Sequence, residues 1–159
     1  SDEVLAIVKV LKDLSLTLAL PPAWLSFACL SATQLNIGEP LTKALASLNY
    51  VDPTSTYVPI VGINCTSPVF VPSLLSVIEN NGNRATILYP NSGEGWDAVN
   101  KTWTSGTSGE GKNENPYITC LADCCKRKRG GKGMIVGGCC RVEPDDIEKV
   151  VELCRVAKE

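Results

Sequence analysis

Histidine is absent from the 159 residues of this chain, and methionine occurs once, as Met134. Without histidine, the chain can build neither a Ser-His-Asp triad, nor a Cys-His dyad, nor a mixed Cys/His zinc finger. Because the single methionine lies far from Ser1, we expect the native start to be missing and the chain to be a piece of a longer protein. No basic segment, apolar segment and small-residue cleavage site follow one another near Ser1, so we predict no signal peptide.

The chain also lacks a marked excess of positive or negative charge. Its net charge is −2, and charged residues make up 20% of the chain. This balance favours neither nucleic acid nor an anionic membrane as a partner. A long stretch without a charged residue runs from Leu14 to Gly38, but Pro21 and Pro22 interrupt it and polar residues dilute it. A membrane span needs roughly 20 mostly apolar residues, so we predict no membrane segment.

Cysteine is the residue that the chain does contain in excess, with eight copies. That number is above average use but below that of a disulfide-rich scaffold. Because no export signal is evident, we predict a reducing, cytoplasmic location. In that compartment, clustered cysteines more often bind metal or react than form disulfides.

Apolar residues follow two periods along the chain. A spacing of i, i+3, i+4 and i+7 predicts amphipathic helices, and short apolar runs predict buried strands. The expected helices lie around residues 4–11, 41–48, 71–78, 118–125 and 147–154, and the expected strands at 23–29, 58–64, 85–89 and 134–136. This alternation predicts an α/β fold with a parallel sheet. Two architectures fit it: a small doubly wound sheet, or about half of an eight-stranded barrel.

One long polar stretch, from Pro90 to Asn115, interrupts the alternation and is rich in Gly, Ser and Thr. We expect a short helical turn near Trp96–Trp103. A connection of this length is typical of a functional or mobile loop.

Three cysteines stand where predicted strands end. Cys65 follows the strand at 58–64, and Cys139 and Cys140 follow the strand at 134–136 after Gly137 and Gly138. In α/β folds, sites form at the carboxyl ends of strands, and glycines allow the turn that two adjacent cysteines need to point the same way. Three thiolates with one open position are typical of a catalytic zinc site. The alternative is that these cysteines are small buried hydrophobic residues.

Strings around these cysteines resemble a known family. The segments VGINCTSP, YPNSGEGWD and IVGGCCRVEPDDI are similar to those of the homocysteine S-methyltransferase family, and so are AWLSFA and the GEPL that follows it. The resemblance covers nearly the whole chain, in the right order. It implies a (β/α)8 TIM barrel, of which this chain holds only about the last four βα units. Residues 1–159 are then the C-terminal half of a homocysteine-binding domain.

The resemblance also implies a reaction and a site. The reaction is the zinc-dependent transfer of a methyl group from S-methylmethionine or S-adenosylmethionine to homocysteine, which forms methionine. The implied zinc ligands are Cys65, Cys139 and Cys140, and the homocysteine sulfur is the fourth. Asn64 is implied to orient the substrate, and Ser92 and Glu94 to line the donor pocket. Because the nucleophile is the substrate thiolate, the absence of histidine is no obstacle.

The chain departs from the family in two respects. The first four strands are missing, together with the acidic residues there that hold the homocysteine amino group, so an N-terminal half-barrel in the same or another chain is an expected partner. The helix before GGCC usually carries a tryptophan, whereas this chain has the segment ITCLADCC at 118–125. The alternative function is a truncated, catalytically silent zinc-binding fragment. We predict that Cys29, Cys120, Cys124, Cys125 and Cys154 serve in packing.

Overall fold

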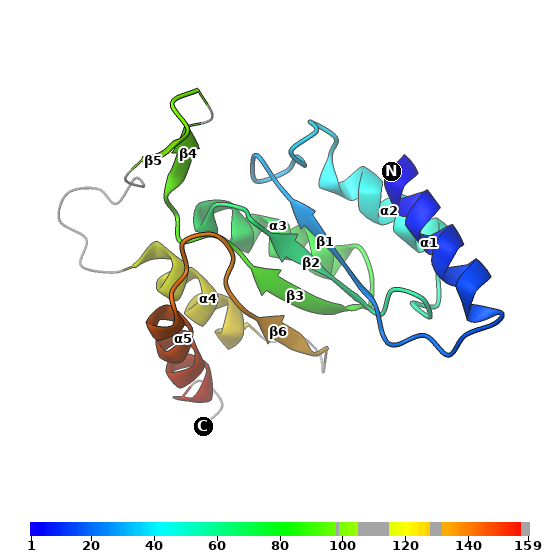
Figure 1. Ribbon diagram of the computed structural model, residues 1–159. Helices are drawn as coiled ribbons and strands as arrows, with labels where there is room; N and C mark the ends of the chain where they lie inside the picture. The colour runs from blue at the N-terminus through cyan, green and yellow to red at the C-terminus, as the bar shows by residue number, and fades with distance from the viewer. Residues whose placement is uncertain (98, 105–114, 128–131, 157–159) are drawn as a thin grey trace.

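The fold is described from a computed structural model over residues 1–97, 99–104, 115–127 and 132–156 (Figure 1). Four parallel strands form one sheet in the order β1 (Trp24–Ala28), β2 (Ile60–Asn64), β3 (Ala85–Tyr89) and β6 (Met134–Val136). The helices are α1 (Asp2–Ser15), α2 (Leu41–Val51), α3 (Val71–Asn80), α4 (Pro116–Lys126) and α5 (Pro144–Val156). The predicted α/β fold with a parallel sheet is confirmed.

Prolines mark the starts of several helices. A short 3-10 helix at Pro68–Phe70 leads into α3, and α4 and α5 begin at Pro116 and Pro144. Proline fits the first turn because its missing N–H has no partner there in any case. The start of α4 is also capped, since the side-chain oxygen of Asn115 accepts the backbone N–H of Tyr117 at 3.0 Å.

The core lies between one face of the sheet and the helices, of which α3 and α4 lie behind the sheet in the view of Figure 1. Alternate strand residues point into this core, as expected for a sheet with one covered face. The buried strand residues Phe27, Val61, Ile63 and Leu88 pack in one cluster with Leu41, Leu45, Leu48, Leu74, Leu75, Tyr117, Leu121 and Val150 of the helices. The amphipathic spacing in the sequence therefore identified the helix faces that are buried.

The other face of the sheet is much less covered. By strand alternation and register, Trp24, Ile87 and Ile135 share this face, and Trp24 and Ile135 are 54% and 48% exposed. With Tyr89 they line a shallow pocket of about 240 Å³. Within the described residues, β1 and β6 each pair with a single strand and so form the two edges of the sheet. This open arrangement contrasts with a closed barrel, which has no edges.

The stretch after β3 differs from its prediction. Instead of a helical turn near Trp96–Trp103, the strands β4 (Gly95–Asp97) and β5 (Thr102–Thr104) form a small antiparallel sheet. The hairpin follows the end of β3 and projects away from the main sheet (Figure 1). The rest of the long polar stretch, residues 105–114, lies outside the described residues. Every helix in the described ranges is too short or too polar to span a membrane.

Candidate metal centre

Cys65 lies at the first position after β2, where the chain turns sharply. Its φ of 43° falls in the left-handed region, which is uncommon for residues other than glycine. The backbone N–H of Cys65 donates to the carbonyl oxygen of Tyr89, the last residue of β3, at 3.2 Å. This turn ends the strand at Asn64 and holds Cys65 at the carboxyl edge of the sheet.

Cys139 and Cys140 lie in the loop that follows β6. The backbone N–H of Cys139 donates to the carbonyl oxygen of Pro90 at 2.9 Å, and that of Ser92 donates to the carbonyl oxygen of Cys140 at 3.1 Å. The left-handed residue here is Arg141, with a φ of 64°, and not one of the glycines. Gly138 is needed for another reason, because a Cβ there would collide with the side chain of Val142.

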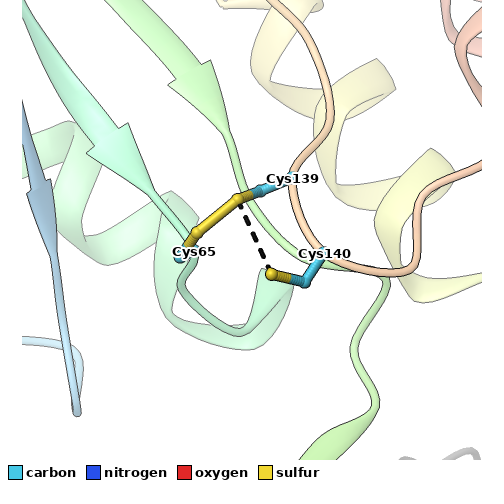
Figure 2. A group of neighbouring side chains, drawn as sticks. All are labelled: Cys65, Cys139 and Cys140. Carbon is cyan, nitrogen blue, oxygen red and sulfur yellow. Dashed lines mark hydrogen bonds between the residues drawn. A yellow bond between two sulfur atoms is a disulfide. The ribbon is translucent and has the colours of Figure 1, made fainter.

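The structure brings these three cysteines together (Figure 2). Their Sγ atoms lie within 4.8 Å of one another, Cys65 and Cys139 are half-buried, and Cys140 is exposed. Cys65 and Cys139 are joined by a disulfide bond, and the Sγ of Cys140 lies 3.9 Å from that of Cys139. The set offers three sulfur donors, of which two become available to a metal only after the disulfide is reduced.

The predicted substrate-binding residues lie around this cluster. Asn64 is the last residue of β2 and pairs in register with Tyr89 of β3, so both side chains share the open face of the sheet. Ser92 bonds through its backbone to the loop of Cys140, as described above, and its Oγ accepts the N–H of Glu94 at 3.5 Å. The carboxylate of Glu94 accepts a 2.8 Å hydrogen bond from the Nε of Arg141, which raises the pKa of the guanidinium.

The other cysteines divide into two groups. Cys29, Cys120 and Cys124 are buried thiols, in agreement with the packing role that the sequence suggests. Burial raises the pKa of Cys29 to about 11. A hydrogen bond with Cys124, followed by burial, raises the pKa of Cys120. Both thiols therefore stay protonated near neutral pH and are poor nucleophiles and metal ligands.

Cys125 and Cys154 differ from the prediction in being joined by a disulfide bond, although Cys154 also packs against the core. Cys125 stands near the end of α4 and Cys154 in the last turns of α5, with Cα atoms 5.6 Å apart. The prediction erred because it treated each cysteine on its own helix, whereas the apolar faces of α4 and α5 pack side by side. The expectation that clustered cysteines here would not form disulfides is wrong for this pair, and also for Cys65 and Cys139 in this state.

Comparisons with known proteins identify the family of the chain. The family model for homocysteine S-methyltransferase matches residues 1–154. The chain belongs to the homocysteine S-methyltransferase family. Among curated relatives, Homocysteine S-methyltransferase YbgG of Bacillus subtilis is 29% identical over 98% of this chain, and Homocysteine S-methyltransferase 1 of Zea mays is 28% identical over 96%.

Solved structures of the homocysteine methyltransferase MmuM from Escherichia coli share the fold. The oxidized form matches with a TM-score of 0.60 and 22% identity over 99% of this chain, and the metallated form with 0.60 and 23% over 93%. The chain covers 41% and 40% of these structures and 44% and 43% of the two curated relatives. It therefore spans less than half the length of these relatives and structures. MmuM is a TIM-barrel protein.

One contact of the site was not foreseen from the sequence. The ion pair between Glu94 and Arg141 joins the loop after β3 to the loop after β6. A signal for it was present, because one loop carries Glu94, the other carries Arg141, and the two loops follow strands that are neighbours in the sheet. This signal predicts the ion pair only when the order of the strands in the sheet is known, and the spacing of apolar residues in the sequence does not give that order.

Proposed function

We propose that this chain forms the zinc-binding part of an enzyme that transfers a methyl group from a sulfonium donor, S-methylmethionine or S-adenosylmethionine, to homocysteine. The observation that carries the proposal is the convergence of Cys65, Cys139 and Cys140 at the carboxyl edge of the sheet, in a chain of this family. The products are methionine and the donor's thioether. The methyl group moves without its bonding electrons, and the donor sulfur loses its positive charge.

The donor set fits zinc. Thiolates are soft ligands, which favour zinc over magnesium or calcium, and three of them leave one tetrahedral position open for a substrate. Reduction of the Cys65–Cys139 bond takes up two electrons and two protons, and each thiol then loses its proton on binding the metal. When bound, zinc would hold the homocysteine sulfur as a thiolate, which is the nucleophilic form.

The remaining residues serve to bind and orient the substrates. In this proposal, Asn64, which directly precedes Cys65, orients homocysteine, and Ser92 and Glu94 line the donor side of the site. No proton leaves the methyl carbon during the transfer, so the reaction needs no general base at that carbon. The absence of histidine from the chain is compatible with this chemistry.

We further propose that the chain is the C-terminal half of the homocysteine-binding domain and that an N-terminal half-barrel completes it. Two structural features support this proposal: the exposed apolar face that carries Trp24 and Ile135, and the two sheet edges formed by β1 and β6. A third support is that the chain covers only 44% of the length of the Bacillus subtilis relative. A four-stranded partner would pair with both edges and cover that face. A cytoplasmic location is part of the proposal, because the three thiols bind metal only when reduced.

The test is methionine formation by the zinc-loaded, reduced protein that carries this chain at its native length. Methionine should form from homocysteine with at least one of the two sulfonium donors, and the Cys140→Ser variant should form none above background. The Cys154→Ser variant is the matched control, since it removes a cysteine outside the trio and should keep activity. A folded, zinc-loaded protein that forms no methionine with either donor would instead be the catalytically silent zinc binder.

A further inference from the structure

The loops that follow β3 and β6 are tied together at three points. Two are the backbone hydrogen bonds of Cys139 to Pro90 and of Ser92 to Cys140, at 2.9 and 3.1 Å. The third is the ion pair between the Nε of Arg141 and Oε2 of Glu94, at 2.8 Å. Each contact involves Cys139, Cys140 or the adjacent Arg141, so the three contacts restrain the backbone that carries the two sulfur atoms.

The ion pair acts at the strained point of this loop. Arg141 directly follows Cys140 and has a left-handed backbone with φ of 64°, a conformation that non-glycine residues keep only when surrounding contacts enforce it. Cys140 itself is exposed and is not part of a disulfide. The position of its sulfur therefore depends on the turn at Arg141, and Glu94 holds the side chain of that turn.

We propose that Glu94 and Arg141 form a latch, defined as this ion pair, that positions Cys140 as the third metal ligand. The inference rests on the proposed function and adds two positioning residues to it. Loss of a group that hydrogen-bonds to a metal ligand typically weakens metal binding about 10- to 100-fold. The latch acts through the backbone next to Cys140, so we expect an effect at the lower end of that range. Glu94 then has two proposed roles: it lines the donor pocket, and through Arg141 it positions Cys140.

The latch could also stabilise the fold as a whole, and this role can be measured separately from its role in zinc binding. The side chains of Arg141 and Glu94 are 53% and 32% exposed, and pairs this exposed contribute little to the stability of a fold. Loss of the latch should therefore leave the urea midpoint of unfolding nearly unchanged. Its effect should be confined to the two loops and to metal binding.

The experiment is a double-mutant cycle on zinc affinity. The dissociation constant of the reduced protein is measured by competition with a chelator for the wild type, Glu94→Gln, Arg141→Gln and the double variant. We expect each single variant to bind zinc about tenfold more weakly and the double variant to be no worse than the singles, because all three lack the same contact. Asp123→Asn, which breaks the exposed pair with Lys126 on α4, is the control and should bind like the wild type.

Simple charge effects give another pattern and would overturn the latch. If only charge mattered, removing the positive Arg141 would tighten cation binding while removing the negative Glu94 would weaken it, and the double variant would cancel the two. Equal affinities in all four proteins would also overturn the proposal. A wild type that binds no zinc would refute the metal assignment of the proposed function instead.

A second measurement needs no metal. Amide hydrogen exchange in the zinc-free protein should be about tenfold faster at Ser92 and Cys139 in both single variants, since those N–H groups bridge the two loops. The N–H of Gly137, which bonds to Leu88 at 2.8 Å inside the sheet, serves as the internal control and should not change. Unchanged exchange at Ser92 and Cys139 would overturn the latch even if zinc affinity fell.

Discussion

Replacing Cys139 by serine is expected to lower the zinc content of the reduced protein from about one ion per chain to near zero. Cys139 is central to the cluster, because its sulfur is bonded to that of Cys65 and lies 3.9 Å from that of Cys140. A serine hydroxyl stays protonated at neutral pH and is a poor zinc ligand, so the variant keeps only two of the three donors. Zinc is quantified by elemental analysis after reduction, loading and buffer exchange.

Two comparisons make this result specific. Cys154→Ser, measured under the same reductant, should keep about one zinc, because Cys154 lies outside the trio. The wild type left oxidised should take up little zinc, since the Cys65–Cys139 bond withdraws two donors. Zinc retained by a variant that lacks all three cysteines would place the metal elsewhere and refute the site.

The disulfide between Cys125 and Cys154 is expected to contribute about 3.5 kcal/mol to the stability of the oxidised protein. The bond closes a loop across a sequence separation of 29, and loop-closure entropy in the unfolded chain gives this magnitude. The loop contains β6 and the Cys139–Cys140 segment, so the bond also encloses an edge strand and two of the three cysteines of the metal centre. The Cys125→Ser/Cys154→Ser double variant should unfold at a clearly lower urea concentration.

Redox conditions provide the control for that comparison. In the presence of reductant both proteins lack the bond, so their unfolding midpoints should converge. Coincident midpoints under oxidising conditions would contradict the contribution that we assign to the bond. Because reduction also frees Cys65 and Cys139, the fully reduced, zinc-binding state lacks this additional stabilisation.

Much of the fold could be predicted because its signals are local. The strands at 85–89 and 134–136 have the predicted bounds, and β1 and β2 differ from theirs only by one or two residues at the ends. Each is a short apolar run between helices whose apolar faces repeat every three or four residues. Such periodicity depends on neighbours in the sequence, so it is visible before the chain folds.

The errors concern features that depend on residues far apart or on very short elements. The β4–β5 hairpin has strands of only three residues in a stretch rich in Gly, Ser and Thr, which is too little alternation to distinguish a strand from a turn. The Cys125–Cys154 bond and the Glu94–Arg141 pair each join two elements that only the tertiary packing makes neighbours. Strand order and helix packing were needed to find them.

The most direct test of the central claim is X-ray absorption at the zinc edge of the reduced, zinc-loaded protein. The account predicts three sulfur ligands at about 2.3 Å and one light-atom ligand, with a fourth sulfur replacing the light atom when homocysteine is added. Four sulfurs before homocysteine would mean that another cysteine of the chain closes the site, which is the arrangement of a structural zinc. That result, or an unchanged spectrum after homocysteine is added, would contradict a centre that binds the substrate thiolate.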